Sequence, residues 1–322
     1  MKKLLLFAAP VIFLAPALSA APPQPITASL TLPSSVVLPG VPFDMTVTLT
    51  NNSSAQASVG LLTRFAFRLP DGTTFSPRAM HLLDPNPYPI GQTWVTLSAG
   101  ESRQFYVQWA SVTPDIFHFS EFSGPGAYDV TLALSASKTD DDYVGEIVTN
   151  AAHLTRIVPA GQDGALWNRM SAAMDGRWAD DGFWNSRTGP AILREILELH
   201  PESAYYPYAI LLREQISPPT VPTTADVERL LTTADRFPSS PAYPHLLLRA
   251  AAITDGFAVD AMYRHDMKAR SEYLRTAERY YDDAANKVKI PILRRIAERQ
   301  RDATHAAIER DRLREASKRI QQ

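Results

Sequence analysis

The chain has 322 residues and no cysteine. This absence excludes disulfides, a cysteine nucleophile, cysteine-ligated zinc and iron–sulfur clusters. Glycine is scarce, with 14 residues against 26 prolines, which is typical of stiff turns and not of flexible linkers. The net charge of −2 gives no overall field that favours nucleic acid or an anionic membrane. At this length the chain can form two hydrophobic cores.

The first 20 residues follow the pattern of a secretory signal peptide. A positive start, MKK, precedes the apolar run LLLFAAPVIFLAPAL, and ALSA offers small residues for cleavage. A membrane anchor is the alternative, although Pro10 and Pro16 interrupt a run that is short for a span. We expect a periplasmic or extracellular protein that does not span the membrane after cleavage. Export without cysteine indicates a bacterial envelope.

Residues 21–160 alternate apolar and polar side chains, which is the pattern of half-buried strands. Turn residues separate the alternating segments and predict an antiparallel β-sandwich. The irregular stretch 76–97 contains DPNPYP and is predicted to be a long loop, because proline cannot continue a central strand. The segments expected to be strands are ITASLTL, FDMTVTLTN, TRFAFRL, SRQFYVQW and YDVTLALSAS.

Three segments resemble the Ig-like domains of secreted bacterial proteins. They are LPGVPFDMTVTLTNNSS, LSAGESRQFYVQW and GPGAYDVTLAL. The resemblance implies an Ig-like sandwich, with Tyr128 as the corner tyrosine of that fold. It implies nothing specific about function, because this architecture serves many unrelated activities.

From residue 161 the apolar residues recur at helical spacing, which predicts a helical domain over 161–290 and a long basic helix over 291–322. HPESAYYPYA (200–209) is echoed 37 residues later by FPSSPAYPHL (237–246). In each copy a helix ends, a serine caps the next helix and a proline lies in its first turn. Such a phrase at a fixed period predicts stacked helical hairpins.

The segments ILELHP (196–201) and PESAYYPYAILL (201–212) resemble tetratricopeptide-type repeats, in the style found in bacterial envelope assembly factors. The resemblance implies a protein-binding array of two or three degenerate units. It departs from the family at Ile196, Leu211 and Thr233, where small residues are usual. The fold class we predict is therefore β plus α, an Ig-like sandwich followed by a tetratricopeptide-like array.

Charge is divided unevenly along the chain. Residues 264–322 hold 16 Lys/Arg against 10 Asp/Glu, a balance of +6, and residues 21–160 hold 6 against 11, a balance of −5. The basic end is predicted to be a solvated capping helix with ion pairs along it. Contact with an acidic partner, nucleic acid or lipid is the alternative, although nucleic-acid work does not suit an exported protein.

Aromatic residues are the main candidates for a binding surface. A protein partner would use helix-start tyrosines and a tryptophan-rich junction, namely Tyr205, Tyr206, Tyr208, Tyr243, Trp178 and Trp184. Packing between elements is the alternative for each of them. A carbohydrate site would instead use Tyr88, Trp94 and Trp109, in or near the loops of the predicted sandwich.

The sequence offers no catalytic motif. It lacks G-x-S-x-G, a phosphate-binding loop and G-x-G-x-x-G, and its seven histidines do not have metal-ligand spacing. We therefore predict no catalytic residues, no metal and no cofactor, although KTDDDY (138–143) leaves calcium binding open. The main hypothesis is a non-enzymatic envelope scaffold that binds a protein partner through its helices. The alternatives are a carbohydrate-binding accessory protein and a hydrolase with an unrecognised site.

Overall fold

The structure is a computed structural model that describes residues 26–41, 43–68, 72, 74–75, 80–81, 94–107, 124–135, 146–174, 189–216 and 222–321. Residues 1–20 and the acidic segment 138–143 lie outside this set. The fold is β plus α, with strands up to Arg156 and helices from Gly161 onward. Within these ranges, no helix is both long and apolar enough to cross a membrane.

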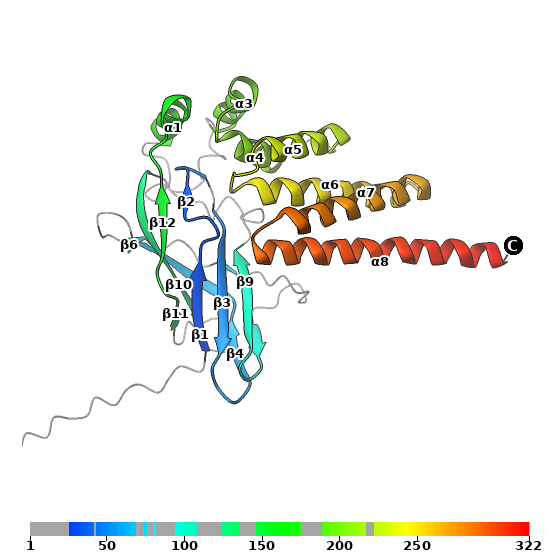
Figure 1. The fold of residues 1–322 in the computed structure, drawn as a ribbon, viewed down its shortest axis with the longest axis horizontal. Coiled ribbons are helices and arrows are strands. Elements are labelled where there is room, and N and C mark those ends of the chain that lie inside the picture. The colour runs from blue at the N-terminus through cyan, green and yellow to red at the C-terminus, as the bar shows by residue number, and fades with distance from the viewer. Residues whose placement is uncertain are drawn as a thin grey trace, which may run out of the picture.

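The described strands form three sheets, drawn in blue to green in Figure 1. One sheet has the order β1-β3-β9, another has the order β2-β12-β10-β5-β6 with β11 and β7 attached, and the third pairs β4 with β8. The pairs are antiparallel except that β2 runs parallel to β12. The strands are β1 (Ile26–Thr31), β2 (Val36–Val37), β3 (Met45–Asn51), β4 (Ala57–Gly60), β5 (Leu62–Arg68), β6 (Thr74–Phe75), β7 (Met80–His81), β8 (Trp94–Leu97), β9 (Ser102–Val107), β10 (Gly126–Ser135), β11 (Glu146–Val148) and β12 (Ala152–Arg156).

All five segments predicted from alternation are strands, and β3 illustrates the reason. It lies between β1 and β9 in its sheet. Its Met45, Val47 and Leu49 are spaced two apart, and all three are buried in the core. The prediction of a loop over 76–97 is wrong at two places. Residues 80–81 form β7, which pairs with β5, and residues 94–97 form β8, which pairs with β4 and buries Val95 and Leu97.

The turn after β3 is organised by one buried side chain, that of Asn51. Its amide nitrogen lies 2.8, 3.1 and 3.0 Å from the carbonyl oxygens of Ala55, Leu97 and Ser98. Its amide oxygen accepts from the N–H and the hydroxyl of Ser53 at 3.0 and 2.8 Å. The turns NNSS (51–54) and SAGE (98–101) therefore lie against each other, fixed by a fully satisfied buried amide.

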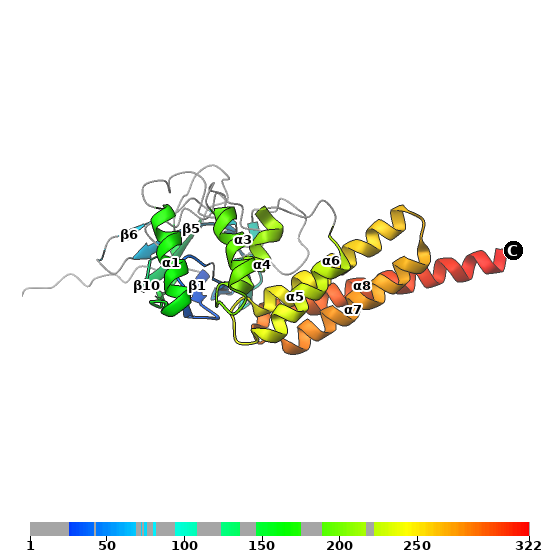
Figure 2. The same cartoon turned by 90° about the horizontal axis from the view of Figure 1, so that it is seen from above.

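From α3 onward, helices that follow each other in the chain pack against each other (Figures 1 and 2). The last four, α5 to α8, lie side by side and extend away from the sheets, with the C-terminus at the far end of α8. The helices are α1 (Gly161–Met174), α3 (Gly189–Leu199), α4 (Tyr206–Ile216), α5 (Thr224–Arg236), α6 (Tyr243–Tyr263), α7 (Met267–Lys287) and α8 (Pro291–Gln321).

The repeated phrase forms the same turn twice, but the predicted capping role of its serines is wrong. In the first copy the hydroxyl oxygen of Ser203 accepts from the N–H of Tyr205 at 3.1 Å, and in the second that of Ser240 accepts from Ala242 at 3.2 Å. Helices α3 and α5 end 37 residues apart, and α4 and α6 begin 37 residues apart. The N-cap of α6 is Ala242, without a side-chain cap hydrogen bond, so each serine closes the turn just before the helix and does not cap the helix itself.

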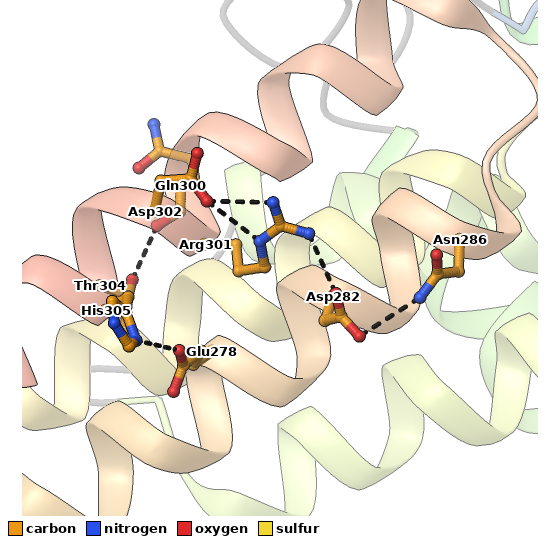
Figure 3. A network of polar contacts seen from close by, with 8 residues as sticks. All are labelled: Glu278, Asp282, Asn286, Gln300, Arg301, Asp302, Thr304 and His305. Carbon is orange, nitrogen blue, oxygen red and sulfur yellow. Dashed lines mark hydrogen bonds and ion pairs between the residues drawn. The ribbon is translucent and has the colours of Figure 1, made fainter.

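Helix α8 is held along α7 by apolar packing and by ion pairs (Figure 3). Arg301 bridges Asp282 of α7 and its neighbour Asp302, at 3.0 Å to each, and these hydrogen bonds raise the pKa of the guanidinium. His305 lies 2.8 Å from Glu278 one turn further along. Because these pairs are exposed, buried residues such as Leu293 and Ala297 contribute more to holding the helix.

One continuous core runs through both the sheets and the helices. The same cluster of buried apolar side chains includes Val47 and Leu132 from strands and Ile196, Leu246 and Ala297 from helices. The two halves of the sequence therefore bury their apolar faces against each other.

We expect Asn51→Ala to lower the free energy of unfolding by at least about 2 kcal/mol, because it leaves buried carbonyls without donors. Urea denaturation followed by circular dichroism measures this. The neighbouring Asn52→Ala is the matched control, since Asn52 is exposed and makes one side-chain bond to Thr27. Its expected effect is below about 0.5 kcal/mol. Equal effects of the two changes would contradict the role given to Asn51.

Candidate functional site

A cluster of buried polar side chains lies where the sheets meet the helices. Asp44 accepts a hydrogen bond from the hydroxyl of Tyr106 at 2.7 Å, and its two carboxylate oxygens lie 2.9 and 3.1 Å from Nε2 of His245. Tyr106 and His245 also stack, with ring centroids 6.5 Å apart. None of the three is more than 8% exposed. We call Asp44, Tyr106 and His245 the junction cluster.

Three different elements supply the junction cluster. Asp44 directly precedes β3, and Tyr106 lies in β9 opposite Thr46, so strand pairing brings the first two together. His245 lies in the first turn of α6, although it is 201 residues from Asp44 in the chain. The carboxylate of Asp44 is therefore close to a helix N-terminus, where negative charge is favoured.

Arg156, at the end of β12, is a second buried charge beside the junction cluster. Its Nη1 donates to the carbonyl of Leu38 at 3.0 Å, and its Cζ lies 5.8 Å from the centre of the Phe43 ring. Loss of solvent lowers the pKa of the guanidinium to about 10, while the nearby hydroxyls of Tyr205 and Tyr208 act in the opposite direction. The cation is thus held by carbonyl and aromatic groups of the junction.

Each serine of the two repeated turns also forms a hydrogen bond with an earlier helix. The hydroxyl of Ser203 donates to Asp163 in the first turn of α1 at 2.6 Å, and Ser240 forms a hydrogen bond with Tyr208 of α4. Tyr205 donates to the carbonyl of Pro39 at 3.1 Å, in the loop that follows β2. The repeated phrase therefore links helix to helix and helix to sheet.

Trp167 of α1 packs closely against that same loop. Gly40 has φ of +74°, a region that favours glycine, and a Cβ placed there would lie 3.1 Å from the Trp167 ring. Trp167 is buried. Trp167 therefore packs between the strands and the first helix.

The junction cluster has the Asp–His pair of many hydrolases but not their access. A catalytic histidine must reach a substrate, whereas Nε2 of His245 faces Asp44 and Tyr106 in the interior. Among the described residues there is also no group of three or more His, Asp or Glu side chains that could hold a metal. The chemistry of the cluster is that of a structural connection between the two parts.

The tyrosines predicted to bind a partner fall into two groups. Tyr205 and Tyr208 are buried, so neither ring is available at the surface, and burial raises the pKa of both hydroxyls. This corrects the surface role expected for them. Tyr206 and Tyr243 are half-buried at equivalent positions of the two repeats, so the partner-binding prediction stays with them. Trp178 and Trp184 lie outside the described residues.

Tyr206 belongs to a small cluster on the repeat edge. Its ring centroid lies 6.2 Å from that of Phe237, and Arg236 lies over both rings at 5.9 and 5.5 Å. Arg236 also pairs with Glu202 of the first repeat. We call Tyr206, Arg236 and Phe237, with Tyr243 beside them in the chain, the repeat-edge patch.

Of the three residues predicted for a carbohydrate site, only Trp94 lies within the described part of the chain. Trp94 begins β8, where it pairs with Gly60 and is half-buried. Tyr88 and Trp109 lie outside the described residues. The carbohydrate site stays a prediction.

Sequence reasoning missed Asp44, Tyr106 and Arg156 as parts of one site. The weak signals were an acidic residue in the apolar context FDM, and an arginine at the end of the buried strand β12. His245 was expected only to lie at a repeat boundary. No sequence spacing relates it to Asp44, because the contact joins the two parts of the fold.

No protein family and no functionally characterised protein matches the sequence. Solved structures give weak likenesses. One is an alkylpurine DNA glycosylase from Pseudomonas fluorescens, with TM-score 0.26 and 11% identity, covering 41% of this chain and 30% of that one. Another is a sporulation control protein from Bacillus subtilis, with TM-score 0.27 and 10% identity, covering 47% and 56%.

A third is a β-glucuronidase from Bacteroides uniformis, with TM-score 0.22 and 12% identity, covering 70% of this chain and 32% of that one. The chain spans less than two thirds of the length of each of these three proteins. Likenesses at this level assign neither a fold nor an activity, so the function is argued from the geometry.

We expect His245→Ala to lower the free energy of unfolding by about 3–5 kcal/mol, because it leaves the buried Asp44 with the Tyr106 hydroxyl but without its partner on α6. His153→Ala is the control, since His153 also pairs with an aspartate, Asp129, but its side chain is 84% exposed. Its expected effect is below about 0.5 kcal/mol. Chemical denaturation of both variants tests the prediction, and similar small effects would show that the junction cluster is not a buried connection.

Stability is expected to fall above about pH 10. Burial raises the pKa of Tyr205, Tyr208 and Tyr281 above the ordinary 10.0, so the folded state keeps protons that the unfolded chain loses. Arg156 opposes this, because its folded pKa of about 10 lies below 12.5 and its contribution to stability therefore rises with pH. Because three tyrosines lower the stability at high pH and one arginine raises it, the net stability is expected to fall.

Urea unfolding at about pH 9 and about pH 11 measures this decline. Tyr205→Phe should make it shallower, while Tyr263→Phe should leave it unchanged, because Tyr263 is 74% exposed. A decline of the same slope in both variants would contradict the assignment.

Proposed function

We propose that the chain is an exported, non-enzymatic scaffold protein that binds a protein partner through the edge of its helical repeats. In this proposal the strands form an Ig-like sandwich, the helices form a degenerate tetratricopeptide-like array, and the sandwich carries the array. The signal-like pattern of residues 1–20 supports export.

Two features of the strands support the Ig-like part. The hydroxyl of Tyr128 donates to the carbonyl of Gly124 at 2.7 Å, four residues upstream, as a corner tyrosine does. The turn after β3 is closed by Asn51, and it lies against the Gly-Glu turn that precedes β9. Both features fall in the segments whose wording resembles that family.

The repeated turn supports the array. Helices α3 and α4, and then α5 and α6, are joined by turns with the same serine hydrogen bond and matching backbone hydrogen bonds. The hydroxyl of each serine also contacts an earlier helix, α1 for Ser203 and α4 for Ser240, and this supports stacking of the units through the turn. Large side chains at Ile196 and Leu211 are buried between helices, which explains why the small residues of the family are not needed here.

The observation that carries the functional proposal is the repeat-edge patch. Half-buried aromatic rings under an arginine are well suited to protein recognition, since aromatic and arginine side chains dominate the energy of interfaces. Tyr243 holds in the second turn the position that Tyr206 holds in the first. The junction cluster fixes α6 on the strands and so fixes the direction in which the patch faces.

The test is affinity capture from the native envelope with mass-spectrometric identification, using the mature protein as bait. We expect one specific protein to be retained, and Tyr206→Ala combined with Tyr243→Ala to lower its yield at least about tenfold. Tyr280→Ala is the matched control, because Tyr280 is also half-buried with an arginine, Arg279, over its ring at 5.4 Å.

Circular dichroism confirms that the variants fold. Retention that is unchanged in the double variant, or enrichment of polysaccharide in place of a protein, would contradict the proposal. Turnover of an ester, peptide or glycoside by the purified protein would favour the hydrolase alternative.

A further inference from the structure

The end of α8 is positively charged and stands apart from the other helices. Residues 310–322 hold five Lys/Arg against two Asp/Glu, a balance of +3, whereas the whole chain has a net charge of −2. In both views α8 projects beyond the α6–α7 hairpin, with the C-terminus at its tip (Figures 1 and 2). The excess of cations is therefore concentrated where the other described helices do not cover it.

An ion pair between α7 and α8 shows which side of this end faces the rest of the protein. Asp311 accepts a hydrogen bond from Nε of Arg270 at 2.5 Å, and Arg270 lies in the first turn of α7. Helix α8 continues to Gln321, so its end runs past the start of α7. The side of α8 that carries Asp311 is thus the side that faces α7.

The acidic and apolar residues of this end lie on opposite sides of the helix. Asp311 and Glu315 are each two residues from Leu313, which is about 200° around an α-helix. Both acids therefore lie on the side of α7, and Leu313 points away from it. Leu313 is 65% exposed, and Ala316, three residues further on, is exposed as well. We call Leu313 and Ala316 the apolar strip of α8.

Arginines lie on both flanks of the apolar strip. Arg310 and Arg314, four residues apart, share one flank of Leu313. Arg312 lies on the other flank, and all three arginines are exposed. Arg312 reaches Glu309 at 3.7 Å, but among the described residues no carboxylate forms an ion pair with Arg310 or Arg314. At least two of the flanking cations can therefore meet an external anion.

This distribution of charge fits a lipid surface. A helix that lies on an anionic membrane turns an apolar strip toward the acyl chains, carries cations on both flanks at the level of the headgroups, and keeps its acids away from the lipid. An acidic protein would require the cations but would give no reason for an exposed leucine between them. The end of α8 has all three features of the membrane-surface helix.

We propose that the projecting end of α8 binds the surface of an anionic lipid membrane. The apolar strip faces the lipid, the flanking arginines contact headgroup phosphates, and the pair of Asp311 with Arg270 keeps this end attached to the helices. The binding is peripheral and involves no membrane span. The repeat-edge patch lies at the other end of the array, where α6 begins beside the sheets, so each site can be tested without the other.

Cosedimentation with lipid vesicles tests the role of the arginines. We expect the mature protein to bind vesicles of phosphatidylglycerol and phosphatidylcholine, and to bind them less as salt is raised. Arg310→Glu combined with Arg314→Glu should lower the partition coefficient at least about tenfold. Arg275→Glu combined with Lys289→Glu is the matched control, because it changes the net charge equally at exposed cations elsewhere. Circular dichroism confirms that both variants fold.

The absence of cysteine allows a test of the apolar strip. Leu313→Cys gives a single thiol that can carry a polarity-sensitive fluorophore. Its emission should shift to the blue when the anionic vesicles are added, because the label enters the headgroup region. The same label on Leu199→Cys is the control, since Leu199 is 67% exposed at the end of α3, and its emission should not change.

Four results would overturn the proposal. The first is a protein that does not bind the anionic vesicles, and the second is one that binds pure phosphatidylcholine equally well. The third is an equal loss of binding in the two charge variants, which would mean that only net charge matters. The fourth is a label at residue 313 that stays in water on bound vesicles while polyglutamate is retained as tightly as lipid, which would assign an acidic protein to this end of α8.

Discussion

The contact between Asp44 and His245 is the constraint on which the arrangement of the two parts depends. A buried carboxylate loses its hydration, and it is tolerated only where other groups replace the lost water. Here one replacement, the hydroxyl of Tyr106, comes from the neighbouring strand β9, but the other comes from α6. The strands therefore cannot bury Asp44 favourably unless the helix is docked.

Arg156 of β12 also connects the strands to the helices. Its guanidinium donates to the loop after β2 and lies near the hydroxyls of Tyr205, just before α4, and Tyr208 of α4. Two buried charges of opposite sign thus lie at the boundary between strands and helices, each contacted by groups from more than one element. Together with the continuous apolar core, this makes the junction rigid, so α6 projects from the strands in a defined direction.

The proposed function uses that rigidity. The repeat-edge patch lies near the turns, close to the junction, and the first turn of α6, which holds His245, connects the two. A partner bound at the turns would therefore be held in a defined orientation relative to the strands.

The sequence by itself determined the local structure. Alternation with period two located five strands, helical spacing located the helices, and the repeated phrase located the two serine turns, because each depends on residues within one or two turns of each other. It missed β12 and the shorter strands, among them β8, whose pairing with β4 spans a proline-rich segment. Only the tertiary structure decided the site. It moved Tyr205 and Tyr208 into the interior and joined Asp44 to His245, 201 residues away. Burial and long-range pairing depend on how whole elements pack, and no spacing along the chain encodes that.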